Sequence, residues 1–213
     1  MTKAAPTGAL TQLPPSPPPR LGPPAEALTT RSRTLLDDLE KLIVTEGFAA
    51  FTLADLARQL RCSLRAFYAI APTRYDLLLV VVDRRMRRLG RRVREELADH
   101  DDPLARLHLV LTLEATAMQA TSAQFRHDAR ALPEMIELIL AHRRYGASMI
   151  HQILVEGMRQ GRFRQVDPGL VVEFIDAAVS RLEQPRFADG ADHRWSEYVE
   201  ELSRFVEAGV LGR

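Results

Sequence analysis

The sequence has very little cysteine, no long hydrophobic run and almost no net charge. Cys62 is the single cysteine among 213 residues, which excludes an internal disulfide and a metal site built from several cysteines. No run approaches the roughly 18 consecutive apolar residues that a membrane span needs. The N-terminus also lacks the basic start and apolar core of a secretory signal. These absences favour a soluble, cytoplasmic protein.

The net charge of +1 conceals a segregation of charge along the chain. Residues 29–98 hold fourteen basic and nine acidic residues, a net charge of +5, whereas residues 99–213 carry −5. A basic part joined to an acidic part suggests that the first meets a polyanion and the second does not. Chance segregation of surface charge is the alternative, so this pattern does not decide the function alone.

Proline is concentrated at the N-terminus. Eight of the thirteen prolines lie in residues 1–28, where the loss of amide donors prevents both helix and sheet formation. We therefore expect a disordered, proline-rich tail over residues 1–28. A ligand for a proline-binding groove on another protein is the less favoured alternative.

Beyond the tail, apolar residues recur with the period of an α-helix almost everywhere. Leu35, Leu36, Leu39 and Ile43 define one helix face, and Gly47 follows as a helix-ending glycine. No segment shows sustained strand alternation or a hairpin signal. The sequence predicts an all-α protein of about nine helices. After the first helix they are expected near residues 52–60, 64–70, 73–98, 103–121, 122–131, 134–160, 168–184 and 192–210.

Residues 52–70 have the layout of a helix-turn-helix. Thr52 and Asp55 have the spacing of a capping box, and the three-residue break from Arg61 to Ser63 separates two short helices. The major groove of duplex DNA admits one α-helix, and there all four base pairs can be distinguished. A short second helix can therefore present its first side chains to base edges. Helix pairs are common, however, so this layout by itself is weak evidence.

The residues around this layout are more specific. They are Gly47-Phe48-x-x-x-Thr52, the pair Phe67-Tyr68, and Pro72-Thr73-Arg74-x-Asp76-Leu77-Leu78. From Arg33 to Leu78 the chain resembles the TetR family of bacterial transcriptional regulators. The resemblance implies an N-terminal DNA-binding domain over residues 29–75. It also implies a larger helical domain over residues 76–213 that binds a small molecule and forms a homodimer. Two residues depart from the family: Arg61 replaces a turn glycine, and Ala71 replaces an aromatic that Ile70 could substitute.

The resemblance and the chemistry of the side chains together select eight candidate DNA-binding residues. Arg65 can pair with guanine through its guanidinium, and Leu64 can contact a thymine methyl. By resemblance, Tyr68 and Arg74 reach the DNA backbone. Capping alone would explain Thr52 and Ser63, and core packing would explain Leu64. The expected DNA-binding residues are Thr52, Ser63, Leu64, Arg65, Ala66, Tyr68, Thr73 and Arg74.

Seven arginines lie between residues 84 and 94. A DNA contact or an anion site is possible there, but we favour a solvated helix face, partly relieved by glutamates one turn away. For Cys62 we favour a small buried hydrophobe over a redox switch.

The C-terminal part is rich in apolar side chains and suggests two further sites. Residues 125–128 and 131–134 look like segments of regulators that sense acyl-CoA, and a hydrophobic drug or aromatic compound is the equal competitor. We expect the ligand to contact Met118, Phe125, Met149 and Phe174. We expect the dimer interface to include Ala178, Leu182, Val199, Leu202 and Val206. A homodimer would bind a palindromic operator in double-stranded DNA.

The sequence contains none of the catalytic or phosphate-binding motifs that we considered. We therefore expect no enzymatic activity, no cofactor and no metal. The favoured function is a DNA-binding repressor that a small apolar or acyl-CoA-like ligand releases. The alternatives are an all-α carrier or enzyme without specific DNA binding, and a regulator that senses no ligand.

Overall fold

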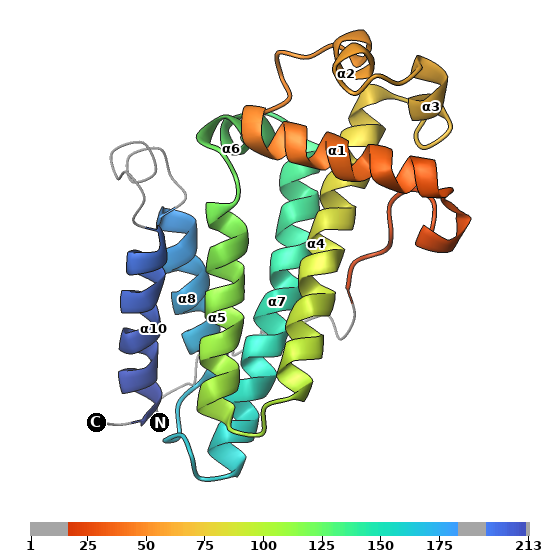
Figure 1. Cartoon of the computed structure of the whole chain (residues 1–213). Helices are drawn as coiled ribbons and strands as arrows, with labels where there is room; N and C mark the ends of the chain where they lie inside the picture. Colours follow the sequence, from red (N-terminus) through yellow and green to blue (C-terminus); the bar gives the residue numbers. More distant parts are fainter. Residues whose placement is uncertain (1–16, 183–194, 212–213) are drawn as a thin grey trace, which may run out of the picture. The chain divides into compact units, whose positions relative to one another are not determined.

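A computed structural model describes residues 17–182 and 195–211 of the chain. These residues form nine α-helices and a short 3-10 turn, Ala25–Ala27, and contain no β-strand (Figure 1). The prediction of an all-α fold is thus confirmed. The helices are α1 (Thr30–Glu46), α2 (Leu53–Gln59), α3 (Leu64–Tyr68), α4 (Arg74–Ala98), α5 (Pro103–Gln119), α6 (Ala123–Arg130), α7 (Pro133–Arg159), α8 (Pro168–Leu182) and α10 (Trp195–Leu211).

Proline and glycine set several helix boundaries. Pro103, Pro133 and Pro168 each begin a helix, a position where a missing amide proton removes no helical hydrogen bond. Gly47 follows α1 with a φ of 80°, in the left-handed region that favours glycine. Arg61, in the turn after α2, has a φ of 50°. That conformation costs a residue with a side chain about 1 kcal/mol, so replacing the expected glycine leaves a strained turn.

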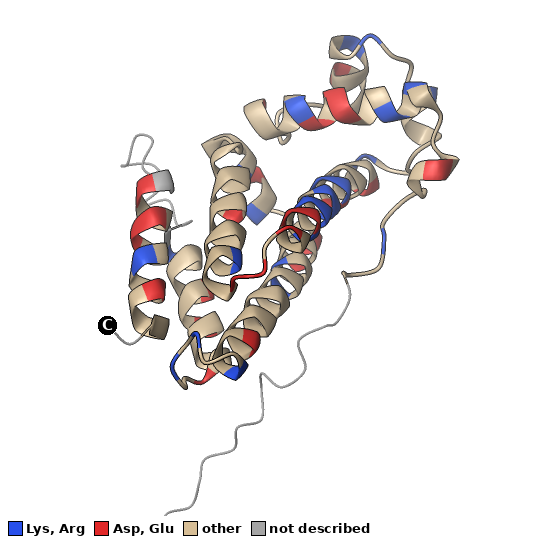
Figure 2. Cartoon of the chain, turned by 60° about the horizontal axis from the view of Figure 1, so that its bottom comes forward, with Lys and Arg blue, Asp and Glu red and all other residues tan. Residues whose placement is uncertain are grey.

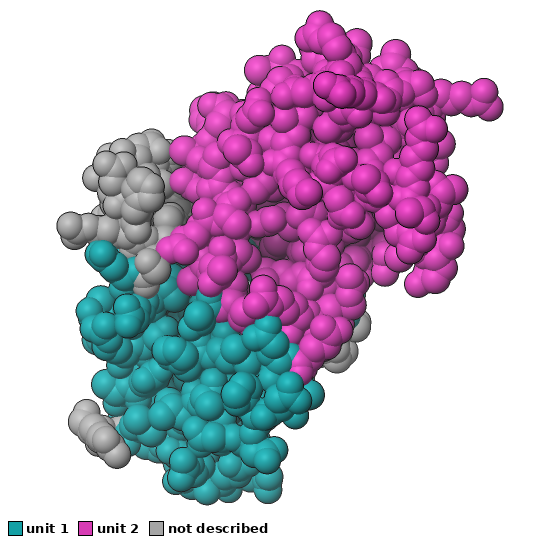
Figure 3. All heavy atoms as spheres, in the orientation of Figure 1, with its two compact units in different colours: residues 1–17, 96–112, 143–213 teal, residues 18–95, 113–142 magenta. Residues whose placement is uncertain are grey.

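The contacts divide the chain into two compact units, coloured separately in Figure 3. Unit 2 comprises Pro18–Glu95 and Leu113–His142. Unit 1 comprises Met1–Pro17, Glu96–Thr112 and Arg143–Arg213. The helices α4, α5 and α7 contribute residues to both units. Compactness therefore divides the chain elsewhere than at residue 75, and the separation into a DNA-binding and a ligand-binding domain stays a prediction about function.

The core of unit 2 joins α1 to the helices that follow it. Leu36, Leu39 and Ile43, on one face of α1, are fully buried. They belong to one apolar cluster with side chains from α2, α3, α4, α6 and α7. Ile70 and Ala71 are also buried in this cluster. The space that an aromatic would take at position 71 is thus part of a core that Ile70 helps to fill.

Residues 17–28, which we expected to belong to the disordered tail, are partly fixed to α4; residues 1–16 lie outside the described part. The amide of Leu21 donates to Oδ2 of Asp83 at 3.1 Å. The carbonyl of Pro18 accepts from the guanidinium of Arg87. A proline-rich segment lacks donors but keeps every carbonyl, and here an arginine on α4 supplies the donor.

Asp83 is the centre of this attachment and is 1% exposed. Its Oδ2 accepts from Nε of Arg87 at 2.8 Å, and its Oδ1 lies 2.8 Å from Nε2 of His142 on α7. Burial by itself raises the pKa of Asp83, but hydrogen bonds from His142, Arg87 and the Leu21 amide outweigh burial and lower the pKa below its ordinary value. The carboxylate therefore stabilises the folded state in its ionised form.

Replacing Asp83 with asparagine should destabilise the protein at neutral pH by roughly 3 kcal/mol, because Arg87 then lacks its buried partner. A depressed pKa in the folded state means that the contribution of Asp83 is complete above the unfolded pKa of about 3.9 and is lost as the pH falls through the lower folded value. The difference between wild type and Asp83→Asn should thus narrow below about pH 4. Urea unfolding at pH 7 and pH 3 measures it. Asp38→Asn, at an exposed position of α1, is the control. A difference in unfolding free energy between wild type and Asp83→Asn that is the same at both pH values would contradict this role of Asp83.

Candidate nucleic-acid interface

The helix α2 begins with a complete capping box. The amide of Asp55 donates to Oγ1 of Thr52 at 3.2 Å, and the amide of Thr52 donates to Oδ2 of Asp55 at 3.0 Å. The Thr52 hydroxyl also donates to Asp55, and this bond is the main cause that lowers the pKa of that carboxyl. Thr52, the N-cap of α2, is exposed, and its hydroxyl proton is used in the bond to Asp55. A phosphate oxygen could therefore reach its hydroxyl only by replacing Asp55 as the acceptor.

The helix α3 is short and is anchored by one aromatic side chain. Phe67 is 1% exposed and belongs to the core of unit 2. The opposite face is open: Leu64 is 41% and Tyr68 is 56% exposed, and Ser63 and Arg65 are also exposed. Large apolar side chains on an open surface often mark a binding site. This face thus carries an apolar, a cationic and a hydroxyl side chain, the types that contact thymine methyls, guanine edges and phosphates.

Ser63 and Thr73 precede helices in different ways. The Ser63 hydroxyl does not cap α3, so capping does not account for this residue. Thr73, before α4, donates to Oδ2 of Asp76 at 2.6 Å and accepts from the Asp76 amide at 3.1 Å. Ala66 is half-buried. The structure therefore brings four predicted residues, Ser63 and three of α3, onto one open face, whereas Thr52 and Thr73 cap the flanking helices.

Arg74 differs from the other candidates because its side chain is half-buried. Its Nη2 donates to the carbonyl of Phe48, and its Nε is buried without a hydrogen-bond partner among the described residues. The guanidinium lies 5.7 Å from the centre of the Tyr75 ring. Arg74 thus contacts the loop after α1, and its phosphate contact stays a prediction.

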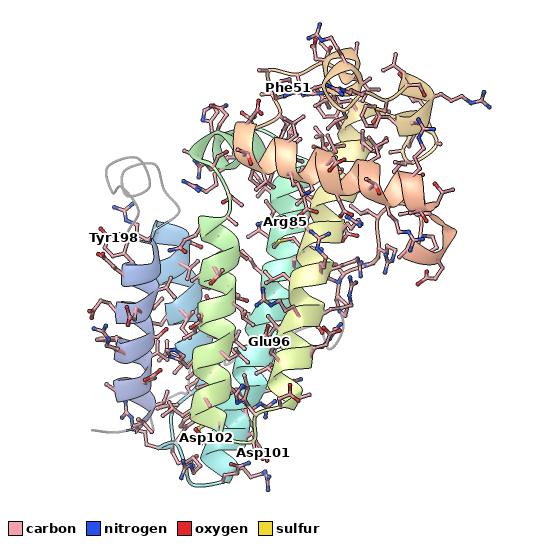
Figure 4. All side chains as sticks on the ribbon, viewed as in Figure 1. Phe51, Arg85, Glu96, Asp101, Asp102 and Tyr198 are labelled. Carbon is pink, nitrogen blue, oxygen red and sulfur yellow. The ribbon has the colours of Figure 1, made fainter. Side chains whose placement is uncertain are left out.

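Much of the arginine run on α4 forms ion pairs with α1. Figure 2 colours the basic residues along the ribbon of α4, and Figure 4 draws and labels the side chain of Arg85. Glu40, 5% exposed, accepts from Arg85 at 3.2 Å and from Arg88 at 2.5 Å. Asp37 accepts from Arg84 at 2.6 Å. Arg87 pairs with Asp83, so four of the seven arginines form ion pairs within unit 2. These four do not form the simple solvated face that we expected. The signal in the sequence was the acidic pair three residues apart on α1.

The four predicted ligand residues belong to different units. Met118 is half-buried and Phe125 is buried, both in unit 2. The Phe125 ring packs edge-on against Phe48, with the ring centres 5.9 Å apart, so Phe125 is part of the core beside α1. Met149 is half-buried in unit 1, and Phe174, also in unit 1, is 45% exposed. A ligand contact of these residues stays a prediction.

The surface of α8 and α10 is more apolar than the predicted interface residues suggested. Val199 and Val206 are 7% and 3% exposed, because both lie on the core stripe of α10, and their place in a dimer interface stays a prediction. Ala178 and Leu202 are half-buried, and the side chain of Leu182 lies outside the described part. Sequence reasoning missed Phe205, which is 65% exposed. The sequence feature that could have indicated it is an aromatic residue next to Val206, a residue of the core stripe.

Phe205 does not stand alone on this surface. Its ring lies 5.4 Å from that of Phe174, at an interplanar angle of 31°. Leu170, on α8, is 68% exposed. Three large apolar side chains on two packed helices form a patch that would lose contact with water in a dimer. We call Leu170, Phe174 and Phe205 the apolar patch.

No helix among the described residues has both the length and the apolar character to cross a membrane. No protein-family model and no curated protein matches the sequence. Solved structures do match it. A TetR transcription regulator from Haloarcula marismortui is 17% identical, with a TM-score of 0.70 over 86% of this chain and 99% of that one.

Two further similar structures contain ligands. A transcriptional regulator from Saccharomonospora viridis in complex with choline is 20% identical, with a TM-score of 0.73 over 86% of this chain and 98% of that one. The regulator FadR from Bacillus subtilis in complex with stearoyl-CoA is 14% identical, with a TM-score of 0.69 over 84% and 98% of the two chains. The described helices and these similarities agree: the chain has the fold of TetR-family transcriptional regulators.

Proposed function

We propose that this protein is a DNA-binding transcriptional regulator, a homodimeric repressor that a small ligand releases from its operator. The open face of α3 is the observation that carries the proposal. Leu64, Arg65 and Tyr68 are exposed there while Phe67 fixes the helix to the core. The net charge of +5 over residues 29–98 supports contact with a polyanion.

In this proposal α3 enters the major groove, and Arg65 reads a base. Ser63, Leu64, Ala66 and Tyr68 complete the contact surface. Thr52 and Thr73, at the starts of two neighbouring helices, lie near the DNA backbone, where helix N-termini commonly contact phosphates.

The apolar patch supports a dimer through α8 and α10. Exposed Leu and Phe side chains gain about 25 cal/mol for each Å² removed from water, and aromatic residues are enriched in interfaces. A two-fold dimer would place two copies of α3 about 34–36 Å apart, or a multiple of that distance, on a palindromic operator.

The similar structures support a small-molecule effector, since one contains choline and another stearoyl-CoA. Acyl-CoA-like compounds and aromatic drugs are the two classes that we propose for this chain. The ligand would favour the dimer conformation that does not fit the operator. A carrier or enzyme that does not bind DNA is the competing function.

Selection of duplexes from a random library by the purified protein tests DNA binding directly. Arg65→Ala should weaken binding to the selected duplex by about 1–3 kcal/mol, because a bidentate base contact is lost. It should also relax the sequence preference at one base pair. Binding to a scrambled duplex at the same salt concentration should change much less. Arg204→Ala, an equal change of charge at an exposed position on α10, should leave both affinities unaltered. Equal losses on both duplexes would show that Arg65 does not read a base, and failure to enrich any duplex would favour the carrier or enzyme.

The apolar patch generates a prediction about assembly. Phe205→Asp should convert the dimer to a monomer at micromolar concentration and abolish tight operator binding, because an unpaired carboxylate would be buried at the interface. Sedimentation equilibrium measures the mass. Ile136→Asp replaces a side chain on α7 that is 38% exposed, and it should remain dimeric. A dimer that tolerates Phe205→Asp would contradict an interface at this patch.

The effector prediction is tested by thermal-shift screening of acyl-CoAs, fatty acids, choline and aromatic drugs, followed by operator competition. A true effector should weaken operator binding by about 5–150-fold, and operator DNA should weaken the binding of that effector by the same factor. Compounds that stabilise the protein yet leave operator affinity unchanged would instead indicate a regulator that does not respond to them.

A further inference from the structure

The peptide at Phe48, between α1 and α2, is held by side chains from two other helices. The amides of Phe48 and Ala49 donate to Oδ2 of Asp128 on α6, at 2.5 and 2.7 Å. The carbonyl of Phe48 accepts from the guanidinium of Arg74, the first residue of α4. The peptide unit between Phe48 and Ala49 thus donates its N–H to one charged side chain and accepts through its C=O from another. We call Asp128, Arg74 and the residues from Gly47 to Ala49 the loop clamp.

Asp128 is itself fixed within unit 2. It is 2% exposed, and its Oδ1 accepts from the amide group of Gln124 at 2.7 Å. At the other end of α6, the Ser122 amide donates to the carbonyl of Val44 at 2.9 Å. Because α6 is bound to the end of α1 at two points, Asp128 has little freedom to move away from the loop. Figure 1 shows α6 beside this end of α1.

Gly47 allows the close approach of α6. It has a φ of 80°, and a Cβ at this position would lie 2.5 Å from Cγ of Gln124 and 2.6 Å from Oδ2 of Asp128. A side chain here would therefore push Asp128 off the two amides. The glycine of the Gly47-Phe48-x-x-x-Thr52 motif has a local reason in this chain.

The loop clamp leads directly into the helix-turn-helix. The amide of Phe51 donates to the same Phe48 carbonyl at 3.3 Å, and Thr52, the N-cap of α2, is the next residue. The position of α2, and with it α3, relative to α4 therefore depends on a loop whose hydrogen bonds come from Asp128 and Arg74. Binding sites require such supporting hydrogen bonds to keep recognition groups within about 0.5 Å of the productive geometry.

We propose that Asp128 and Arg74 are positioning residues for DNA recognition, and that Arg74 acts through the Phe48 carbonyl and not through a phosphate. This role rests on the proposed function. Arg74 already donates to a protein carbonyl through Nη2 and has a buried Nε, so a phosphate contact would leave this hydrogen bond in place and use the remaining N–H groups. The family resemblance implies a phosphate contact at this position, so the two roles make opposite predictions.

Salt dependence separates the two roles. If Arg74 contacts a phosphate, removing its charge should weaken the binding of every duplex. It should also make the plot of log affinity against log salt less steep, by about 0.9. If Arg74 is a positioning residue, Arg74→Met should lower the affinity for the duplex selected by the wild type about 10–100-fold. This is the effect expected for the loss of hydrogen bonds to a charged group. Affinity for a scrambled duplex and its salt slope should stay unchanged. A loss shared by both duplexes, with the lower slope, would overturn the positioning role of Arg74.

Coupling between the two residues gives a second criterion. Asp128→Asn should lower the affinity for the selected duplex to a similar extent. The double variant should lose clearly less affinity than the product of the two single fold-losses, because both residues hold the same peptide. Independent effects, multiplying to within about twofold, would contradict the loop clamp as one unit. Asp38→Asn, on the exposed side of α1, and Arg204→Met on α10 are the matched controls. Gln124→Ala weakens the support of Asp128 and serves if Asp128→Asn does not fold.

Amide hydrogen exchange in the free protein tests the clamp without DNA. Phe48 and Ala49 should be protected in the wild type. Their exchange should accelerate at least tenfold in Gln124→Ala or Asp128→Asn, while the α1 amide of Leu39 keeps its protection. Faster exchange at the loop with unaltered DNA binding would overturn the positioning role alone. Failure of the wild type to select any duplex would overturn the proposed function and, with it, this inference.

Discussion

Burial of one apolar face of α1 is the constraint on which the other elements of unit 2 depend. Leu36, Leu39 and Ile43 have no exposed surface, and shortening one such side chain to alanine typically costs 2–5 kcal/mol. The same cluster contains Phe67 of α3 and Leu78 of α4. The short helix α3 has five residues, too few for independent stability. Its position is therefore a consequence of the α1 core.

Charge pairing adds orientation to this apolar contact. Asp37 and Glu40 on α1 meet arginines on α4, and Glu40 is buried. Apolar packing is non-directional, whereas an arginine fork binds a carboxylate in a defined geometry. The ion pairs thus specify how α1 crosses α4, and Asp83 extends the same chemistry to the segment after Pro17. A run of like charges on one helix is compatible with the fold because the opposite charges lie on its neighbours.

The fold was largely predictable from the sequence because helices report their period locally. The stripe of Leu35, Leu36, Leu39 and Ile43 and the capping box at Thr52 and Asp55 depend on residues within a few turns, and the structure confirms both elements. The exposed face of α3 was predictable for the same reason, because the candidate residues Leu64, Arg65 and Tyr68 lie within one short helix and all three are exposed. The strained turn at Arg61 could also be anticipated from a missing glycine.

Contacts between distant residues could not be predicted in this way. Asp128 and Phe48 are eighty positions apart, and nothing near either residue indicates the other. The hydrogen bond between Asp83 and the Leu21 amide spans 62 positions, and it attaches residues that composition alone describes as disordered. Val199 and Phe205 show a subtler limit: helical spacing identifies apolar positions, but it does not tell which of two adjacent stripes faces the core.

The two-part origin of unit 2 has a consequence for protein engineering. Its core combines Pro18–Glu95 with Leu113–His142, so the helix-turn-helix is not a cassette that ends where α4 begins. A chimaera that transferred residues 29–75 to another regulator would leave Phe48 without the ring of Phe125 and two loop amides without their acceptor. If the proposed function holds, DNA specificity is thus easier to change by replacing the exposed side chains of α3 than by exchanging whole segments. The same separation means that substitutions on the exposed face of α3 leave the core beneath it intact.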